Sequence, residues 1–250
     1  MLKKRIIPIL LLKGNSVVKT VRFEEPRMVG DAITNVKVFS TRKADEMVIV
    51  DIDASERRSI NFTLFKRLSA QCIMPLTLGG GIRSLEDADN FFKVGADKVV
   101  VNSEFYQNPN LFTQISEKYG RQALVFSLDV IKVDDEYFPV SNRKSIKHDL
   151  DVVEIAKKAQ QYGAGEIILN SVNNDGVMQG YDTKLCDLIA QSVDVPVILA
   201  GGCGSKEDCV SAIEHHASAL AAGSIFYWVG ESILTIKEYM HKQGIEVRLL

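Results

Sequence analysis

The sequence predicts an α/β protein folded as a single (β/α)8, or TIM, barrel over residues 1–250, with an internal half-barrel repeat. Its length of 250 residues is typical of one such barrel. Eight apolar runs of strand length alternate with amphipathic runs of helix length, which indicates a parallel sheet. Several short motifs also recur half a chain apart. An open, doubly wound sheet is the structural alternative.

The predicted strands are short runs rich in Val, Ile, Leu and Ala. They span residues 5–11, 46–52, 74–78, 98–102, 123–129, 166–170, 196–200 and 219–222. The helices between them often open on Ser, Thr, Asp or Asn, which cap helix N-termini. These helices span residues 31–41, 61–71, 84–94, 108–118, 150–162, 183–192, 205–214 and 232–242. No Pro/Gly-rich linker divides the chain, which favours one closed barrel over two domains.

Composition excludes several classes of protein. The 30 Lys and Arg against 32 Asp and Glu argue against nucleic acid as the main partner. The apolar run of residues 6–12 is short, ends at Lys13-Gly14 and is followed by no small-residue cleavage site, so it is not read as a signal peptide. No other segment could span a membrane, so we expect a cytoplasmic protein without a membrane partner. The four cysteines lack Cys-x-x-Cys spacing, so we expect reduced thiols, with no metal site and no cofactor.

The internal repeat links motifs that lie about 120 residues apart. Glu46-Met-Val-Ile-Val corresponds to Glu166-Ile-Ile-Leu-Asn, and Leu78-Gly-Gly-Gly-Ile corresponds to Leu199-Ala-Gly-Gly-Cys. Val101-Asn-Ser corresponds to Ala222-Gly-Ser. The last two pairs follow strands, and the carboxyl ends of barrel strands are where such proteins place their chemistry.

These repeated motifs predict two phosphate-binding sites, one in each half of the barrel. Glycines let backbone N–H groups approach an anion, and serine hydroxyls and helix N-termini add donors. The residues are Gly80, Gly81, Asn102 and Ser103 in one half, and Gly201, Gly202, Gly223 and Ser224 in the other. The alternative is that the glycines only permit tight turns. Two copies favour a small ligand with a phosphate at each end.

The residues resemble the cyclase, or synthase, subunit of imidazole glycerol phosphate synthase from histidine biosynthesis. The likeness covers essentially the whole chain. It rests on residues 4–7, Asp51-Ile52-Asp53-Ala54-Ser55, Gly79-Gly80-Gly81-Ile82, residues 95–99, residues 163–167, Asp175-Gly176, Gly180-Tyr181-Asp182 and residues 247–249. The resemblance also assigns Asp175 and Gly176 to phosphate binding.

The resemblance implies a heterodimer with a glutaminase that docks on the amino-terminal face of the barrel. Ammonia would pass through the barrel to a phosphorylated ribulose substrate at the rim. Arg5, Glu46, Lys98 and Glu166 match the family's gate at the barrel floor, and the alternative is a ring that only stabilises that floor. Asp97 matches a residue that contacts the glutaminase.

One departure from the family concerns the catalytic pair. The family uses two aspartates, at the ends of the first and fifth strands, as general acid and base. Asp129 matches the fifth-strand residue and Lys19 matches a residue of the mobile first loop, but Leu11 stands at the first-strand position. Asn173 replaces a further aspartate. Losing an acid or base typically costs roughly 10²- to 10⁴-fold in rate.

The run Leu10-Leu11-Leu12-Lys13, with Lys19-Thr20 and residues 23–31, is similar to specialised copies of this subunit from bacterial surface-polysaccharide loci. Those copies work with a glutaminase and a sugar amidotransferase that converts an acetamido group to an acetamidino group. We therefore expect a subunit specialised for ammonia supply. The alternatives are a genuine cyclase of histidine biosynthesis, a non-catalytic scaffold that binds a phosphorylated ligand and activates the glutaminase, and, less favoured, a related isomerase.

One polar stretch follows the fifth strand and is interpreted as an exposed excursion. It contains Asn142, Arg143, Lys144 and Lys147.

Overall fold

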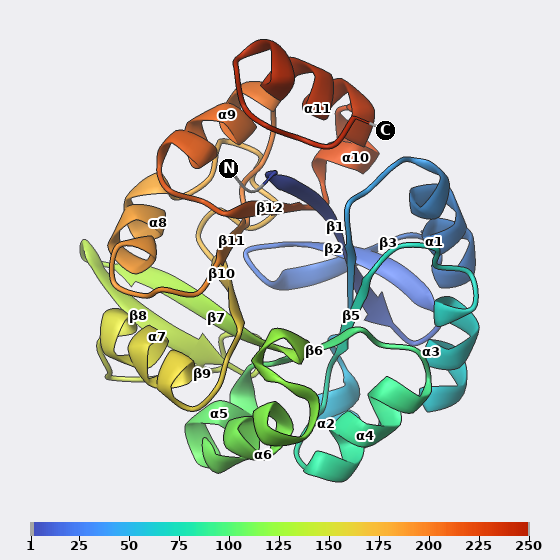
Figure 1. The fold of residues 1–250 in the computed structure, drawn as a ribbon, viewed down its shortest axis with the longest axis vertical. Coiled ribbons are helices and arrows are strands. Elements are labelled where there is room, and N and C mark those ends of the chain that lie inside the picture. Colours follow the sequence, from blue (N-terminus) through green and yellow to red (C-terminus); the bar gives the residue numbers. More distant parts are fainter. Residues whose placement is uncertain (1–2, 250) are drawn as a thin grey trace.

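Eight parallel strands close into a barrel in the computed structural model, which describes residues 3–249 (Figure 1). The two ends of the predicted domain, residues 1–2 and 250, lie outside the described residues. The barrel strands are β1 (Arg5–Lys13), β4 (Met47–Asp51), β5 (Leu76–Gly79), β6 (Lys98–Val101), β7 (Leu124–Val133), β10 (Glu166–Ser171), β11 (Val197–Ala200) and β12 (Ala219–Ala222). β12 pairs with β1, and β7 pairs with β10. The predicted barrel is confirmed, and the open sheet is excluded.

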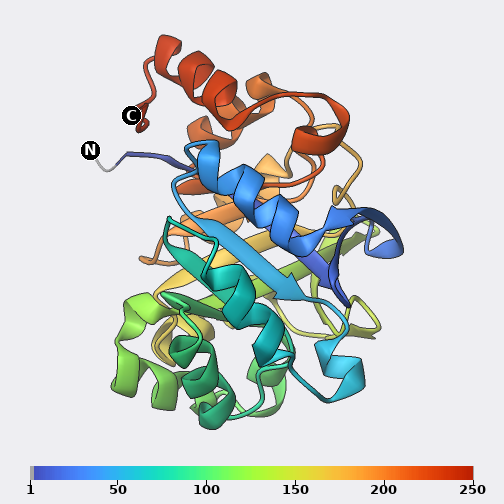
Figure 2. The ribbon, with the colours of Figure 1, turned by 90° about the vertical axis from the view of Figure 1, so that its right-hand side faces the viewer.

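The helices that connect these strands surround the barrel (Figures 1 and 2). They are α1 (Ala32–Thr41), α3 (Phe62–Ser69), α4 (Leu85–Lys93), α6 (Asn110–Tyr119), α7 (Val152–Gln161), α8 (Thr183–Ala190), α9 (Lys206–Glu214) and α11 (Ile233–Lys242). Each lies where the sequence predicts a helix, and the predicted first residue is often the N-cap, as with Asp31 and Ser84. Within residues 3–249, no helix combines the length and the apolar character needed to cross a membrane.

The half-barrel repeat extends to the helix caps. The Ser84 hydroxyl accepts from the Asp87 N–H, and the Asp87 carboxylate accepts from the Ser84 N–H. Ser205 and Asp208 form the same capping box before α9. Each box satisfies N–H groups that the first helical turn leaves free. Each box fixes the start of the helix that follows a glycine pair, so the two halves of the barrel begin these helices with the same capping structure.

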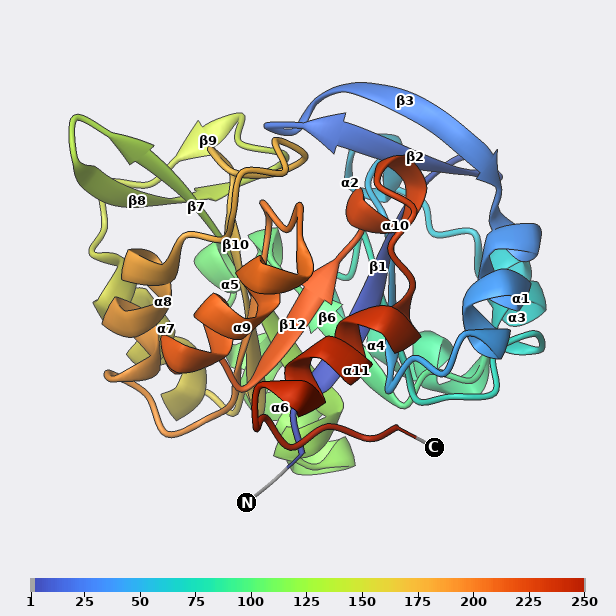
Figure 3. The same cartoon turned by 90° about the horizontal axis from the view of Figure 1, so that it is seen from above.

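Two hairpins extend beyond the barrel and were not anticipated from the sequence. β2 (Ser16–Val21) and β3 (Glu24–Asp31) continue β1, while β8 (Glu136–Ser141) and β9 (Ile146–Lys147) continue β7. Both rise at the same end of the barrel, away from the chain termini (Figure 3). Short helical segments, also unanticipated, are α2 (Ala54–Arg57), α5 (Ser103–Gln107), the 3-10 turn η1 (Arg121–Ala123) and α10 (Ile225–Trp228).

The predicted exposed excursion after the fifth strand is wrong for three of its four residues. Asn142, Arg143 and Lys144 are only partly exposed, and Lys147 alone is exposed. The hairpin folds over the barrel mouth, where the Asn142 N–H donates to the Ser103 hydroxyl at 3.1 Å. This long-range contact holds the start of the loop against the barrel mouth, so Asn142, Arg143 and Lys144 are partly shielded from solvent.

A buried ion pair fastens the last helix to the first strand. Lys237 on α11 is 1% exposed, and its ammonium donates to Asp45 Oδ1 and to the Lys43 carbonyl, both at 2.8 Å. Asp45 Oδ2 in turn accepts from the Ile6 N–H at 2.8 Å. Because both charges are desolvated, removing either one would leave the other buried without a partner of opposite charge.

We predict that Lys237→Ala lowers the free energy of unfolding by about 3–5 kcal/mol, because it leaves the Asp45 carboxylate buried and unpaired. Urea denaturation measures this loss. The matched control is Lys118→Ala, which removes an exposed ammonium paired with Asp89 and should leave the unfolding midpoint nearly unchanged. A loss for Lys237→Ala as small as that of the control would contradict the prediction.

Candidate functional site

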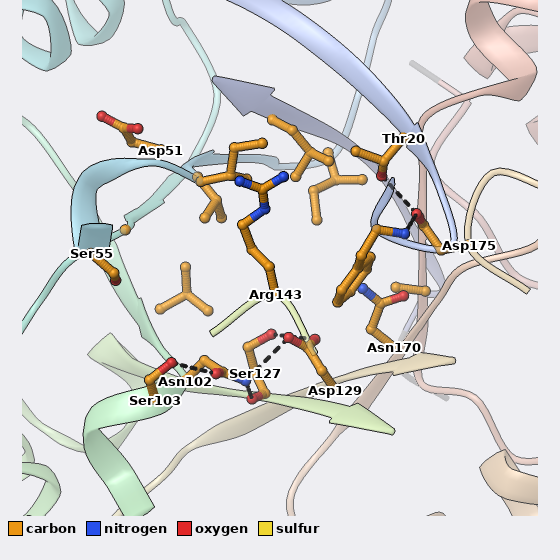
Figure 4. Close-up of a pocket in the computed structure, with 18 of the residues that line it drawn as sticks. Thr20, Asp51, Ser55, Asn102, Ser103, Ser127, Asp129, Arg143, Asn170 and Asp175 are labelled. Carbon is orange, nitrogen blue, oxygen red and sulfur yellow. Dashed lines mark hydrogen bonds between the residues drawn. The ribbon is translucent and has the colours of Figure 1, made fainter. Parts of the chain in front are cut away.

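A cavity of about 780 Å³ opens at the carboxyl ends of the barrel strands (Figure 4). Its lining combines the two glycine pairs and both serines of the predicted phosphate sites with Asp129, Asp175 and Lys19. Residues from both halves of the chain therefore face one space. This is the rim at which barrels of this class bind ligands.

The inward-facing side chains change character along the barrel axis. On β1 the two-residue period of a strand places Arg5, Ile7, Ile9 and Leu11 on the inner face, and on β10 it places Glu166, Ile168 and Asn170 there. Charged residues thus occupy the floor, apolar residues the middle, and mostly polar residues the mouth. Leu11 interrupts this order by placing an apolar side chain at the mouth.

The floor is closed by the four predicted gate residues. The Arg5 guanidinium lies 2.6 Å from Glu46 and 2.8 Å from Glu166, while the Lys98 ammonium lies 3.1 and 2.7 Å from the same carboxylates. Burial opposes the charge of Arg5, but Glu166 and Glu46 outweigh it, so the Arg5 pKa is raised. Each charge contacts two of opposite sign, which offsets the cost of desolvating the ring.

An apolar layer lies above this ring. It consists of the buried residues Ile7, Val48, Val100, Val125, Ile168, Ile198, Ala200, Ala219 and Ala221. Val100, Ala200 and Ala221 also line the cavity, so the layer is continuous with the cavity wall. A small neutral molecule crosses such a layer more readily than an ion does, because an ion would lose its hydration.

Asp129 is the carboxylate at the polar side of the mouth. Its oxygens accept from the Asn102 amide at 3.2 Å and from the Ser127 hydroxyl at 3.3 Å (Figure 4). Burial, with a smaller contribution from Asp175, raises the Asp129 pKa to about 7. Both protonation states are therefore populated near neutral pH, which suits a residue that gives and takes protons.

Lys19 and Asp175 meet at the β2–β3 hairpin. The Lys19 ammonium donates to the Ile9 carbonyl at 2.8 Å, and burial lowers the Lys19 pKa to about 8, although Asp175 opposes this shift. Asp175 accepts from the Thr20 hydroxyl at 2.7 Å and, more distantly, from the Phe23 N–H. The Asp175 carboxylate thus holds the hairpin over the mouth.

The two predicted phosphate sites have matching backbones. Gly80 and Gly81 have φ of 106° and 78°, and Gly201 and Gly202 have φ of 85° and 107°, all in the region that favours glycine. A Cβ on Gly80 or Gly202 would also collide with a backbone carbonyl. The helices after the serines, α5 and α10, have only five and four residues, so their dipoles add little positive potential.

The remaining predicted residues take distinct places. Gly176 has φ of 69° and lies against Thr20, beside Asp175. Asn102 bridges the Ser103 hydroxyl to Asp129. Asp97 is exposed on the loop before β6, at the opposite end of the barrel from the cavity.

Arg143, like Asn142 before it, lines the cavity, although the sequence predicts an exposed loop there. Its guanidinium lies 3.5 Å from both Asp53 and Glu56, which belong to the β4–α2 segment. Nothing in the local sequence distinguishes it from the exposed basic residues nearby.

Comparisons with known proteins agree with this geometry. Residues 5–230 match the family described as histidine biosynthesis protein. Among similar proteins, imidazole glycerol phosphate synthase subunit HisF of Hydrogenobaculum sp. is 42% identical over the full length of both chains. Two relatives carry provisional names as numbered subunits of that synthase. They are hisF3 of Vibrio vulnificus, 39% identical over 92% of this chain and 90% of its own, and hisF2 of Campylobacter jejuni, 36% identical over the full length of both.

We predict that Asp129 makes stability fall as pH rises. In the unfolded chain an Asp carboxyl ionises near pH 4, whereas in the folded protein the Asp129 pKa is about 7. The folded state therefore binds more protons between these values, and the free energy of unfolding decreases across that window. Asp129→Asn should raise this free energy by roughly 2–3 kcal/mol more at pH 8.5 than at pH 5.

Urea unfolding of both proteins at the two pH values tests this prediction. Asp135→Asn, at the exposed turn of the same hairpin, is the control and should give no extra gain at high pH. Equal gains from Asp129→Asn at both pH values would show that the carboxyl is not desolvated.

Proposed function

The chain belongs to the histidine biosynthesis protein family and, within it, to the HisF-type subunits, and on this premise we propose that it is the barrel subunit of a glutamine-dependent amidotransferase. A partner glutaminase supplies ammonia, and the barrel conducts it to the cavity. The ammonia then serves acetamidino-sugar formation in surface-polysaccharide biosynthesis, with a sugar amidotransferase as a further partner. The observation that carries this proposal is the order of three layers along the barrel axis: the charged ring at the floor, the apolar layer above it and the mostly polar mouth.

Those layers suit the passage of ammonia between the floor and the cavity. The four-residue ring lies across the floor, and the apolar layer above it favours neutral ammonia over ammonium. The cavity beyond has two matched phosphate sites that can hold a ligand at both ends. We assign Arg5, Glu46, Lys98 and Glu166 to the gate, and the glycine and serine residues of the two cradles to phosphate binding.

The amino-terminal face of the barrel suits a protein partner. Asp97 is exposed there, on the loop before β6. Ile73 lies on the loop before the neighbouring β5 and is 83% exposed, which is unusual for a large apolar side chain. An exposed apolar residue and an exposed carboxylate, on loops that precede neighbouring strands, support docking of the glutaminase at this face.

The mouth favours ammonia supply over cyclisation. Leu11 lines the cavity where the family has an acid, so Asp129 lacks its catalytic partner. The numbered names of two relatives distinguish one HisF-type subunit from another and so support a specialised copy.

A genuine cyclase remains the second candidate because Asp129 is present with a pKa of about 7 and a HisF subunit is 42% identical over the full chain.

We predict that the purified chain, given the ribulosyl bisphosphate substrate of histidine biosynthesis and ammonium salt at high pH, cyclises it roughly 10²- to 10⁴-fold more slowly than a working cyclase. Leu11→Asp restores a group that can exchange a proton and should raise the rate. Leu11→Asn, of similar size but unable to ionise, is the matched control and should not. A wild-type rate equal to that of a working cyclase would favour the second candidate.

For the ring, we predict that Glu46→Ala combined with Lys98→Ala opens the floor. Removing one anion and one cation together leaves Arg5 paired with Glu166, so no charge is stranded. In the reconstituted complex, more of the ammonia released from glutamine should escape into solution rather than reach the acceptor, with glutamine hydrolysis retained. Lys118→Ala with Asp89→Ala, which removes an ion pair on the outer surface, is the control. Unchanged ammonia escape would return the ring to a purely structural role.

A further inference from the structure

Arg143 extends from the loop between β8 and β9 into the mouth of the barrel. Its side chain is 28% exposed, and Figure 4 shows it across the middle of the cavity, between Ser55 on one side and Asp129 on the other. None of the roles proposed above uses it.

The contacts of Arg143 and its neighbours place the side chain in front of the cradle formed by Gly81 and Ser103. At one end, the N–H of the preceding Asn142 donates to the Ser103 hydroxyl. At the other end, the guanidinium reaches Asp53 and Glu56, which flank Ala54. Gly81 lies directly behind, because a Cβ on it would come within 2.9 Å of the Ala54 Cβ. The side chain therefore spans the cradle from one edge to the other.

The guanidinium is only loosely held in this position. Its two carboxylate contacts are 3.5 Å long, whereas charge-assisted hydrogen bonds measure about 2.7–2.9 Å. Two nearby ion pairs, Arg57 with Asp51 and Lys144 with Glu24, are both 2.6 Å. Arg143 therefore retains donors that can turn to a better acceptor.

The backbone that presents Arg143 is strained. Asn142, Arg143 and Lys144 have φ of 48°, 54° and 64°, a run of three left-handed residues without a glycine. Each costs free energy, and such residues persist where the surrounding structure fixes them, commonly at ligand-binding segments. The contact with Ser103 and the pair between Lys144 and Glu24 fix this run at the cradle.

The other half of the barrel has a counterpart of Arg143, which is Lys19 on the first hairpin. Leu11 pairs with Val18 in the first hairpin, and Lys19 follows Val18 by one residue. Asp129 pairs with Val140 in the second hairpin, and Arg143 follows Val140 by three residues. Lys19 lies against Gly223, since a Cβ there would collide with its ammonium. Each hairpin thus brings one cation to the cradle beside its own strand.

We propose that Arg143 is a ligand-binding residue that leaves Asp53 and Glu56 to bind the phosphate held by Gly81 and Ser103. This inference rests on the proposed phosphate cradles and adds a specificity determinant to one of them. The planar guanidinium can bind two phosphate oxygens through two parallel N–H donors, a fixed geometry that an ammonium does not offer. The ligand is therefore selected for an anionic group with two accessible oxygens at this end, and the loop closes over it.

The test measures binding of the ribulosyl bisphosphate substrate by calorimetry at fixed ionic strength. Arg143→Ala should weaken binding roughly 10- to 100-fold, and Arg143→Lys should recover only part of the loss. The matched control is Lys147→Ala, which removes an exposed charge on the adjoining strand β9 and should change binding less than about twofold. Circular dichroism and thermal unfolding establish that each variant is folded.

A double-mutant comparison locates the contact. The losses of substrate affinity caused by Arg143→Ala and Ser103→Ala should be non-additive in the double variant, because both residues act on one phosphate. The losses caused by Arg143→Ala and Ser224→Ala should combine, in the double variant, to within about twofold of their product. Binding by Arg143→Ala equal to wild type, or a loss that couples equally to both serines, would overturn the role of Arg143. If neither serine variant weakened binding, or wild type did not bind the substrate, the phosphate cradles themselves would fail, and this inference with them.

Discussion

Closure of β1 against β12 is the constraint on which the rest of the structure depends. Only a closed barrel brings the glycine pair after β5 and the pair after β11 to opposite sides of one cavity. Closure also gathers Arg5, Glu46, Lys98 and Glu166, which belong to four separate strands or their starts, into one ring. An open sheet would leave each of these charges with fewer partners, and a partly buried charge without its partner is costly.

One barrel strand can therefore contribute different kinds of side chain to the floor and to the mouth. A single strand such as β1 carries a cation at the floor, apolar residues in the middle and Leu11 at the mouth. A change at one inward position can therefore alter chemistry at the mouth without disturbing the ring. In the proposed function, Leu11 supplies no proton at the mouth, while the charged ring and the apolar layer below it are kept. That separation explains how a barrel could keep ammonia transfer while losing cyclisation.

Sequence reasoning predicted the parts of the fold that depend on local pattern. Apolar runs located the eight barrel strands, and capping residues such as Ser84 and Ser205 located helix starts. The ring was expected only through resemblance, because nothing local shows that Arg5 and Glu166 meet. The hairpins were missed because their turns, at residues such as Arg22 and Phe23, adopt positive φ without glycine. Arg143 was misplaced because its position follows from the contact between Asn142 and Ser103, which are far apart in the chain.

A crystal structure of the chain with the ribulosyl bisphosphate substrate would test most directly whether both cradles serve one ligand. We expect one molecule to span the cavity, with one phosphate against Gly81 and Ser103 and the other against Gly202 and Ser224. A ligand bound elsewhere, or held at one end only with the second cradle turned away from it, would contradict the proposed site.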